Sequence, residues 1–440
     1  MNLSLVVPAY NEEQRIVPTL EKYCAFFPKV TDKLEVIVVV NGSTDSTLVR
    51  VNEYRKKFPF VRTINVSEKI GKGGALIVGL HAAQYDIMGF LDADDAFELD
   101  RLIPLLKELD AKKVDVAIAS KWKGRSFWQV NEPFSRKVMS RVWNFLSRTF
   151  LHLPFTDTQA GAKFFRKEAW DTLPKNFIGR GFEFDVDLLD RFWYQAYRIK
   201  EFYVPSKHKQ LSTFSVKHTF SMFVNLMRIA RQPRAQSPAH YYRAYSKGSD
   251  PAHVFYRVKM NKILSFIPPD GSFLDAGCGS GVLPYLVAKK KGGKVAGVDL
   301  RDDQVALARR LCPVGEFKQG DLRTLHFGKK FATVNCSDVI EHFKPAQREM
   351  VLNSLDRHVA TGGRLVMVFP SWFYIRVFEQ VWKIVRNKVL HPFTSFDDDH
   401  IHEVVLPGEI VVFFKEKGYN KVYQRKILLG LLECVVMKRA

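Results

Sequence analysis

Cysteine is scarce in this sequence, and the cysteines that occur are not arranged to crosslink the chain or to bind zinc. The five residues are Cys24, Cys278, Cys312, Cys336 and Cys434. No two of them form a CxxC pair, and none is spaced from histidine as in a zinc site. An odd and scattered set argues against a disulfide framework and against a structural zinc. We therefore expect a protein of the reducing cytosol.

Long hydrophobic runs are also missing. The apolar residues 3–7 have no basic residue before them and run directly into Pro8, which is unlike a secretory signal. The longest apolar candidate elsewhere, residues 427–437, contains Glu433 and is shorter than the roughly 20 residues that cross a bilayer. These absences predict a cytoplasmic protein, either in solution or at the cytoplasmic face of a membrane.

Acidic residues are few compared with basic ones. The chain has 67 lysines and arginines but only 46 aspartates and glutamates, which gives a formal net charge of +21. A surface of this kind attracts phosphate groups, nucleic acid or anionic lipid. The net charge therefore favours an anionic partner, but it does not indicate a fold.

Two series of alternating strands and helices predict two α/β domains, because 440 residues exceed what one hydrophobic core usually supports. Strands are expected at residues 4–8, 34–40, 61–66, 87–91 and 114–119, and again at 272–276, 294–299, 331–337 and 363–369. Residues 233–251, rich in proline, serine, glycine and charge, predict a linker. We expect domains over 1–232 and 252–440, each with a Rossmann-like parallel sheet covered by helices.

Two aspartates follow an apolar strand in the sequence LDADD. Open α/β sheets bind ligands at this end of a strand, and the spacing of Asp92 and Asp94 can direct both carboxylates at one divalent ion. Such an ion would bridge the phosphates of a nucleotide sugar and stabilise charge on the leaving diphosphate. A solvated acidic turn has the same local pattern, but the surrounding βαβ series favours the metal site.

With these residues, positions 1–232 resemble glycosyltransferase family 2, and within it the dolichyl-phosphate glucose and mannose synthases. The ordered motifs are VVPAYNEE (6–13), NGSTDST (41–47), GKGGA (71–75), LDADD (91–95), TDTQAGAKFF (156–165) and FEFDVDLL (182–189). The resemblance implies a nucleotide-sugar-binding GT-A fold. It implies these roles: Pro8, Tyr10 and Glu12 at the base and ribose, Asn41 by the base, Lys72 near the diphosphate, and Asp92 with Asp94 holding Mg²⁺ or Mn²⁺.

The resemblance leaves the nucleotide open. Relatives commonly carry DDGS where this chain has Val40, Asn41, Gly42 and Ser43, so the first carboxylate near the base is absent. The donor is therefore a UDP-hexose or a GDP-hexose. Processive relatives carry TED and QxxRW motifs, whereas this chain has TDTQ (156–159) and lacks the tryptophan after Arg198. Transfer to a carrier lipid is favoured over polymer synthesis.

A polyprenyl phosphate acceptor would need cationic residues more than a general base, because a phosphate monoester is already ionised at neutral pH. Cations would hold that phosphate for attack on the anomeric carbon. The resemblance assigns this role to Lys121, where the family has arginine, and to Arg136 with Ser140, one helical turn apart. The segment 212–231, apolar with interspersed basic residues, reads equally as a helix at the membrane interface or as a core helix.

A second set of motifs begins with DAGCGSG at 275–281, in which glycines after an apolar strand allow a tight turn and close approach of a ligand to the backbone. With QGDL (319–322), NCSDVIEHF (335–343) and TGGRLVMVFP (361–370), residues 252–440 resemble class I S-adenosylmethionine methyltransferases. The resemblance implies these contacts: Asp275, Gly277, Gly279 and Gly281 with the methionine end, Asp299 with the ribose, Asp321 and Leu322 with the adenine, and Ser337 and Asp338 beside the methyl donor.

Methyl transfer is a displacement in which the protein orients the acceptor and removes a proton when a hydroxyl is attacked. His342, His400 and His402 are candidate bases. The acidic run 397–399 beside the last two histidines is interpreted as a solvated loop. The motif DVIEHF is typical of relatives that methylate small molecules, and the [DN]PP[YF] tetrad of nucleic-acid amino methyltransferases is absent.

The sequence thus predicts a bifunctional enzyme that transfers a hexose to a polyprenyl phosphate and methylates a small molecule, such as the sugar or glycolipid product. Peripheral membrane contact is expected, and a nucleic-acid partner is not. Two alternatives stay open: a glycosyltransferase acting on a soluble glycan with methyl capping, and a basic RNA-binding methyltransferase, which the net charge of +21 favours.

Overall fold

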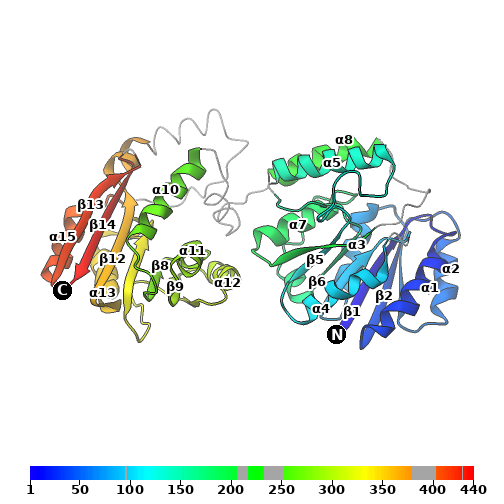
Figure 1. The fold of residues 1–440 in the computed structure, drawn as a ribbon, viewed down its shortest axis with the longest axis horizontal. Coiled ribbons are helices and arrows are strands. Elements are labelled where there is room, and N and C mark those ends of the chain that lie inside the picture. The colour runs from blue at the N-terminus through cyan, green and yellow to red at the C-terminus, as the bar shows by residue number, and fades with distance from the viewer. Residues whose placement is uncertain (95–96, 152, 206–216, 232–250, 379–402, 429) are drawn as a thin grey trace. The chain divides into compact units, whose positions relative to one another are not determined.

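A computed structural model describes the chain except for residues 95–96, 152, 206–216, 232–250, 379–402 and 429 (Figure 1). The chain divides into two compact units, residues 1–232 and 233–440. Most of the predicted linker, residues 233–250, lies outside the described residues. Each unit is a layered α/β structure, as the sequence predicted, and each is described separately below.

The first unit contains a seven-stranded sheet in the order β3-β2-β1-β4-β6-β5-β7. Its strands are β1 (Asn2–Ala9), β2 (Lys33–Asn41), β3 (Val61–Val66), β4 (Ile87–Leu91), β5 (Val116–Ser120), β6 (Ala162–Arg166) and β7 (Ile199–Tyr203). All neighbouring pairs are parallel except those of β6, which runs antiparallel to β4 and β5. The sheet is therefore mixed, whereas the sequence predicted a parallel one.

Helices cover both faces of this sheet (Figure 1). They are α1 (Ile16–Phe26), α2 (Thr47–Arg55), α3 (Gly71–Ala82), α4 (Ile103–Asp110), α5 (Phe134–Phe150), α6 (Lys167–Asp171), α7 (Phe184–Tyr194) and α8 (Lys217–Ala230), with 3₁₀ turns η1 (Phe27–Lys29) and η2 (Leu99–Leu102). The strand β1 shows why two layers form, because successive side chains point to opposite faces. Leu5 and Val7 join the core under α1, α2 and α4, whereas Val6 joins the core under α3, α7 and α8.

The helix α8 corresponds to the predicted segment 212–231, of which residues 212–216 lie outside the described part. Met222, Leu226 and Ile229 are buried in the core of the first unit. Their spacing places them on one helical face, as a core-packing helix requires. No helix among the described residues has the length and apolar composition needed to cross a bilayer.

The second unit contains another seven-stranded sheet, in the order β10-β9-β8-β11-β12-β14-β13. Its strands are β8 (Phe273–Ala276), β9 (Val295–Asp299), β10 (Glu316–Gln319), β11 (Phe331–Ser337), β12 (Val359–Pro370), β13 (Tyr419–Ile427) and β14 (Leu432–Arg439). The helices and turns are α10 (Pro251–Ser265), α11 (Val282–Lys291), α12 (Asp302–Leu311), η3 (Ile340–His342), α13 (Pro345–His358), the π-helical turn η4 (Tyr374–Phe378) and α15 (Pro407–Glu416).

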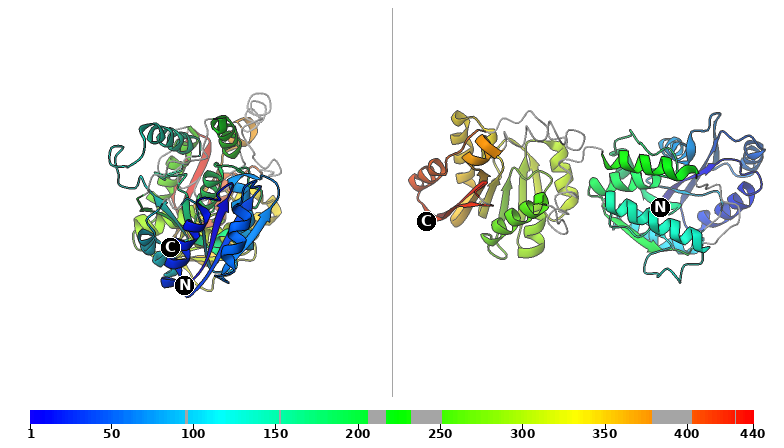
Figure 2. Two further views of the ribbon diagram at one scale, coloured as in Figure 1. Left: turned by 90° about the vertical axis from the view of Figure 1, so that its right-hand side faces the viewer. Right: turned by 90° about the horizontal axis from the view of Figure 1, so that it is seen from above.

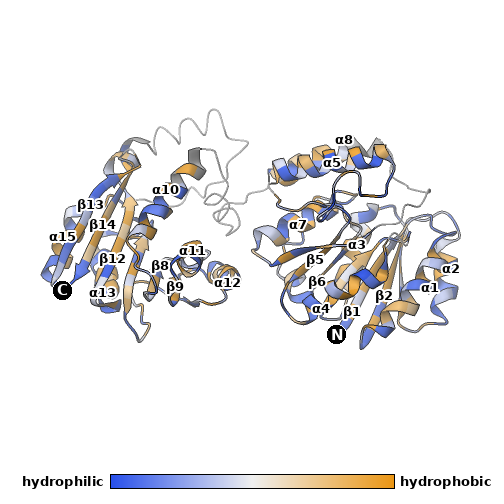
Figure 3. Ribbon diagram, viewed as in Figure 1, coloured by the Kyte–Doolittle hydropathy of each residue, from blue (hydrophilic) through white to orange (hydrophobic). Residues whose placement is uncertain are grey.

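The apolar run 427–437 belongs mainly to β14, which pairs antiparallel with both β12 and β13. Its side chains alternate between two hydrophobic cores, with Val435 and Met437 in one and Cys434 and Val436 in the other, so β14 is covered on both faces, which accounts for the long hydrophobic run. Figure 3 shows the same concentration of hydrophobic residues along the strands of both sheets. Both sheets are thus mixed, because each includes one strand that reverses direction.

Candidate active sites

The first candidate site lies where the strand order of the first sheet reverses, between β1 and β4. In open α/β sheets, ligands bind at the carboxyl ends of the strands beside such a reversal. Here β1 ends at Ala9, β2 at Asn41 and β4 at Leu91. The predicted residues Tyr10, Glu12, Asn41, Asp92 and Asp94 all lie at or just beyond these ends.

Four side chains of alternating charge form the centre of this site. The Lys72 ammonium lies 2.6 Å from Asp92 Oδ1 and 3.8 Å from Asp185 Oδ2. The other oxygen of Asp185 accepts a 2.5 Å hydrogen bond from Lys163, which is fully buried on β6. Lys163 also donates to the Ala160 carbonyl oxygen at 2.6 Å. Lys72 of the GKGGA motif, which was predicted to lie near the diphosphate, therefore forms an ion pair with Asp92 of the LDADD motif.

Burial and mutual charge shift the pKa values of these groups. Burial raises the pKa of Asp92, and the nearby Asp94 adds to the shift against the opposing effect of Lys72. Burial alone would lower the pKa of Lys72, but the carboxylates of Asp92 and Asp185 outweigh it and raise that pKa. Burial lowers the pKa of Lys163, against the opposing effect of Asp185. The carboxylates therefore repel one another and depend on the lysines for compensation.

Asp94 and Glu12 add negative charge to the same region. Asp94 Oδ1 is buried and has no hydrogen-bond partner in the described part of the chain. Burial raises the pKa of Glu12, and Asp94 and Asp92 add to the shift, whereas Arg15, which donates to both Glu12 oxygens at 2.6 Å, opposes it. No group of three or more histidine, cysteine, aspartate or glutamate side chains positioned for a metal occurs among the described residues.

Close packing keeps Asp92 in place. A Cβ added at Gly161, in the TDTQAGAKFF segment, would lie 2.1 Å from Asp92 Oδ2. Any larger residue at that position would displace the carboxylate. This contact connects a motif distant in the sequence to the LDADD motif.

The predicted nucleotide-binding residues border the same strand ends. The Lys69 ammonium lies 3.9 Å from the centroid of the Tyr10 ring. Pro8 is the penultimate residue of β1, two positions before Tyr10. Asn41 is buried, and its Oδ1 accepts a 2.8 Å hydrogen bond from the Ile70 backbone N–H. Asn41 therefore holds the loop that leads into α3, a contact that the sequence motif did not reveal.

Of the predicted acceptor residues, Lys121 directly follows β5, and Arg136 and Ser140 lie on α5. Lys121, the predicted cation for the acceptor phosphate, donates to both oxygens of Glu132 at 2.7 and 2.9 Å and is therefore ion-paired in this structure. Ser140 Oγ accepts a 3.0 Å hydrogen bond from Trp122 Nε1. Arg136 is half-buried one turn before Ser140 on α5 and has no carboxylate partner among the described residues.

Asp157 connects the acceptor side to the central cluster. Its Oδ2 accepts a 3.2 Å hydrogen bond from the Lys121 backbone N–H, and its own N–H donates to Glu201 at 3.0 Å. Burial raises the pKa of Asp157, against the opposing charges of Lys121 and Lys163. Sequence reasoning assigned no role to Lys163 and left Asp185 unresolved. The signal available was a lysine between apolar neighbours in a strand, which must be paired once it is buried.

The second candidate site lies at the corresponding reversal of the second sheet, between β8 and β11. Asp275 is buried at the end of β8, where its Oδ1 accepts a 2.7 Å hydrogen bond from Asn335 Nδ2. Burial raises the pKa of Asp275 to about 7, with Asp299 and Asp338 adding to the shift. Gly277 has a φ of +84°, and a Cβ there would lie 2.2 Å from Val339 Cγ2, so this turn requires glycine.

The other predicted cofactor residues surround this turn. Gly279 and Gly281 also have positive φ angles. Asp299 Oδ2 accepts from the Gly279 N–H at 2.8 Å, and its Oδ1 accepts from the Arg301 N–H at 3.0 Å. Two backbone donors therefore fix the Asp299 carboxylate. The predicted adenine contacts differ in environment, since Leu322 is buried whereas Asp321 is ion-paired with Arg323 at 2.5 Å.

The loop after β11 carries a second group of charges. Asp338, with a φ of +57°, is ion-paired with Lys259 of α10. Glu341 is buried, its Oε2 has no hydrogen-bond partner among the described residues, and burial with the nearby Asp338 raises its pKa to about 8. Ser337 Oγ donates to Asn335 Oδ1 at 2.9 Å. The predicted base His342 is exposed on η3, and His400 and His402 lie outside the described residues.

Two protein families match the two halves of the chain. Residues 4–173 match the family described as "Glycosyl transferase family 2", and residues 273–363 match the one described as "Methyltransferase domain". Glycosyltransferase AglD of Haloferax volcanii is 30% identical over 206 residues, which cover 46% of this chain and 32% of that protein. The dolichyl-phosphate beta-glucosyltransferase of Drosophila melanogaster is 34% identical over 203 residues, which cover 43% of this chain and 62% of that protein.

The chain spans less than two thirds of the length of both relatives. Among solved structures, magnesium protoporphyrin IX methyltransferase of Synechocystis PCC 6803 with bound SAH is 19% identical, with a TM-score of 0.35, covering 49% of this chain and 100% of that one. Together with the sites at the two sheet reversals, the family matches give one conclusion. The chain carries a glycosyl transferase family 2 domain followed by a methyltransferase domain, two classes of enzyme joined in one polypeptide.

Proposed function

We propose that the first unit transfers a hexose, with inversion, from a UDP- or GDP-sugar to a polyprenyl phosphate. The observation that carries this proposal is the group formed by Lys72, Asp92 and Asp94 at the end of β4, in a domain that matches family 2. The dolichyl-phosphate relative supports a prenyl phosphate acceptor.

The residues present fit a divalent cation, Mg²⁺ or Mn²⁺. Asp94 has a buried oxygen without a hydrogen-bond partner among the described residues, and burial beside Asp94 raises the pKa of Asp92 even though Lys72 opposes the shift, so the two carboxylates offer a cation more negative charge than Lys72 offsets. Magnesium is usually held by one or two protein carboxylates together with substrate phosphates, so two aspartates suffice. When bound, the ion would offset the charge that develops on the departing diphosphate. Lys72, already fixed beside Asp92, would bind the same diphosphate.

The acceptor phosphate would attack the anomeric carbon as an ionised nucleophile, so the protein has to position it rather than deprotonate it. Arg136 and Lys121 are the cations for this role, with Ser140 one helical turn from Arg136. Lys121 would exchange Glu132 for the phosphate, since both oxygens of Glu132 hold it in this structure. Attack opposite the leaving diphosphate inverts the anomeric carbon.

The second unit would transfer a methyl group from S-adenosylmethionine to a small molecule, such as the sugar or the glycolipid product. A Cβ at Gly279 would meet nothing within 4 Å, so the backbone of this turn would be open to the methionine end, and Asp275 offers a buried carboxylate to its ammonium group. Asp299, fixed by two backbone N–H groups, would accept hydrogen bonds from the ribose hydroxyls. His342 stays the candidate base for a hydroxyl acceptor.

An acceptor panel tests both activities. Labelled UDP-glucose and GDP-mannose are incubated with a short polyprenyl phosphate, with and without EDTA, and then with labelled S-adenosylmethionine. We expect label in the organic phase with one nucleotide sugar and its loss with EDTA. Label found only in the water-soluble fraction would replace the lipid acceptor with a soluble glycan, and methyl label entering added RNA would support the RNA-binding alternative.

A further inference from the structure

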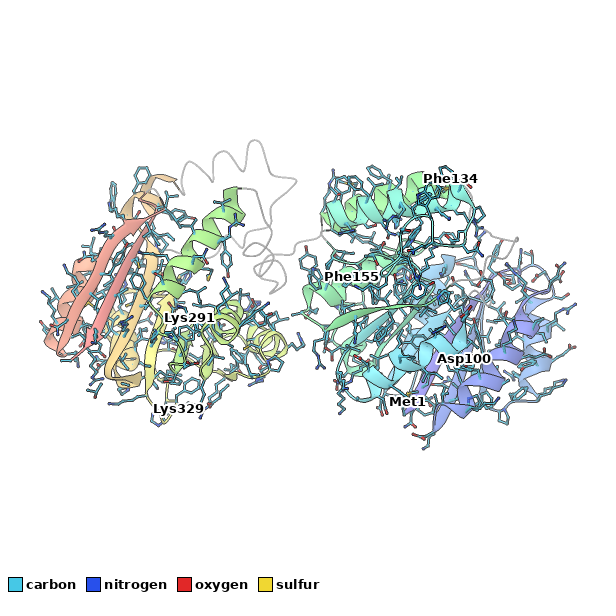
Figure 4. The ribbon with its side chains drawn as sticks, viewed as in Figure 1. Met1, Asp100, Phe134, Phe155, Lys291 and Lys329 are labelled. Atoms are coloured by element: carbon cyan, nitrogen blue, oxygen red, sulfur yellow. The ribbon has the colours of Figure 1, made fainter. Side chains whose placement is uncertain are left out.

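An exposed apolar stripe runs along α5. Four large apolar side chains of this helix are exposed: Phe134 (66%), Val138 (37%), Val142 (52%) and Phe145 (68%). Their spacing of four, four and three residues places them on one side of the helix. Figure 4 shows Phe134 on the outer side of this unit, away from its sheet. Isolated exposed apolar residues are common, but a continuous stripe marks an interaction surface.

The loop before α5 extends this stripe with aromatic side chains. Trp128 is 80% exposed and contacts Phe127, with ring centroids 5.3 Å apart. Phe127 in turn contacts Phe134, at 5.6 Å. Tryptophan with one apolar and one polar edge is typical of the boundary between water and lipid.

The charge on the helices that carry the stripe has one sign. The helix α5 contains Arg136, Lys137, Arg141 and Arg148 and no aspartate or glutamate. Lys137, Arg141 and Arg148 follow one another at spacings of four and seven residues, so they form a basic row beside the apolar one. The adjacent helix α8 also lacks acidic residues. This combination complements an anionic surface with an apolar interior, as in a bilayer.

The helices α5 and α8 lie side by side in two views of the structure (Figures 1 and 2). Phe150 of α5 contacts Phe223 of α8 at 6.2 Å, and Phe223 is itself 39% exposed. On the inner side, Met222, Leu226 and Ile229 anchor α8 in the core. The two helices therefore pack together, and the core beneath α8 holds them in place, so their outer sides form one continuous surface.

The inner face of α5 organises the proposed acceptor site. Asn144 is buried, and its Oδ1 accepts hydrogen bonds from the Thr158 N–H at 2.9 Å and from the Thr158 hydroxyl at 2.8 Å. Thr158 adjoins Asp157, which accepts from the Lys121 N–H. Arg136 and Ser140 lie on the same helix. One helix thus presents apolar and basic residues outward while it holds the acceptor residues inward.

We propose that the outer face of α5, extended by Trp128 and Phe223, docks on an anionic lipid bilayer and brings the acceptor site to the depth of a prenyl phosphate headgroup. This inference rests on the proposed function for its biological purpose, but the binding itself is independent of sugar transfer. The apolar side chains enter the interfacial region, and the basic row contacts lipid phosphates.

Co-sedimentation of the full chain with vesicles tests this surface. Wild-type protein binds phosphatidylglycerol–phosphatidylcholine vesicles more strongly than pure phosphatidylcholine vesicles. The triple variant Phe134→Ser, Val142→Ser, Phe145→Ser loses about tenfold or more in partitioning, because it removes three exposed apolar side chains. The variant Arg141→Gln, Arg148→Gln loses mainly the preference for phosphatidylglycerol, by about fivefold for each charge.

A matched control removes the same number of exposed apolar side chains elsewhere. Val49, Val314 and Val412 are exposed by 58%, 79% and 57%. Their joint replacement by serine leaves vesicle binding unchanged. Equal binding by the α5 triple variant and wild type, or an equal loss in the control, overturns the proposal. A wild-type dimer that becomes a monomer in the triple variant, with unchanged vesicle binding, would make the stripe a contact between copies and also overturn it.

Two acceptors separate this inference from the proposed function. The triple variant keeps sugar transfer to a short prenyl phosphate in solution and loses transfer to a long-chain prenyl phosphate in vesicles. If wild-type protein binds vesicles but transfers sugar to neither acceptor, the proposed function fails and the docking surface stands. If transfer to the vesicle acceptor survives in the triple variant, the docking surface fails and the function stands.

Discussion

Charged side chains make up the candidate site of the first unit, whereas backbone around glycines makes up much of the site in the second. At the end of β4, Lys72, Asp92 and Asp185 lie within ion-pair distance. At the end of β8, the turn through Gly277 presents main chain, and the nearby carboxylates Asp275 and Asp299 are held by neutral amide donors. Both sites occupy the same place in their sheets, at the reversal of strand order.

The difference agrees with the ligands that we propose for the two sites. A nucleotide diphosphate carries concentrated negative charge, so lysines and a cation held by carboxylates suit it. A sulfonium cofactor carries less concentrated charge, so its binding depends more on close contact between its surface and the backbone. We therefore expect the first site to be sensitive to changes of charge and the second to changes of volume.

The largest expected effect is on stability of the first unit. Lys163→Met removes the nearer cation from the buried carboxylate of Asp185 and leaves only Lys72 at 3.8 Å, which costs about 3 to 5 kcal/mol in free energy of unfolding. Chemical denaturation of the full chain measures it. The double variant Lys163→Met, Asp185→Asn loses less than Lys163→Met alone, because no unpaired charge stays buried. The control Lys200→Met, which breaks an exposed ion pair with Glu108, costs less than about 1 kcal/mol.

The next effect is on sugar transfer. Asp92→Asn removes a carboxylate from the Lys72 group, and we expect kcat for sugar transfer to fall about a hundredfold or more. Methyl transfer by the same preparation stays unchanged, because the second site has its own residues. The exposed Asp100 of η2 provides the control Asp100→Asn, for which both rates stay at wild-type values. Unchanged sugar transfer in Asp92→Asn would contradict the assignment.

A volume change is expected to break the second site instead. Gly277→Ala imposes a positive φ on a residue with a Cβ and drives that atom against Val339, which costs about 1 to 3 kcal/mol from the backbone alone. Titration calorimetry with S-adenosylmethionine should show weaker binding while sugar transfer persists. Gly408→Ala, where a Cβ meets nothing within 4 Å, is the control and should bind normally.

The last prediction concerns the pH dependence of stability in the second unit. Burial raises the pKa of Glu341 to about 8, so the folded state holds a proton that the unfolded chain releases above its ordinary value of 4.5. Stability therefore falls as the pH rises from about 5 to about 8, by up to about 1.4 kcal/mol for each pH unit. Hydrogen exchange of β11 and β12 measures it. Glu341→Gln should reduce this slope and leave the part that the raised pKa of Asp275 contributes, whereas the exposed Glu349→Gln should keep the whole slope.

Much of the fold could be predicted because its signals are local. The strands β3, β4 and β11 have the predicted bounds, since apolar runs between turn residues define them without help from the rest of the chain. The antiparallel strands β6 and β14 were not predicted. A strand's direction depends on which neighbour it pairs with, and the residues within it do not carry that information.

The site divides in the same way. The motifs placed Asp92, Asp94 and Lys72 in one region and Asp275, Gly277 and Asp299 in another, and the structure brings each group together at a sheet reversal. The motifs could not show that Glu132 pairs with Lys121 or that Lys163 pairs with Asp185. Those partners are 11 and 22 residues apart and meet only because of how the strands and helices pack.

By itself the sequence determined that this protein has two α/β domains of two enzyme families, because glycine turns, acidic strand ends and strand–helix alternation are written in short segments. Only the tertiary structure decided which charges compensate one another and which side of α5 faces outward. The physical reason is that hydrogen bonds and ion pairs act over a few ångströms in space, so their partners are set by packing and not by distance along the chain.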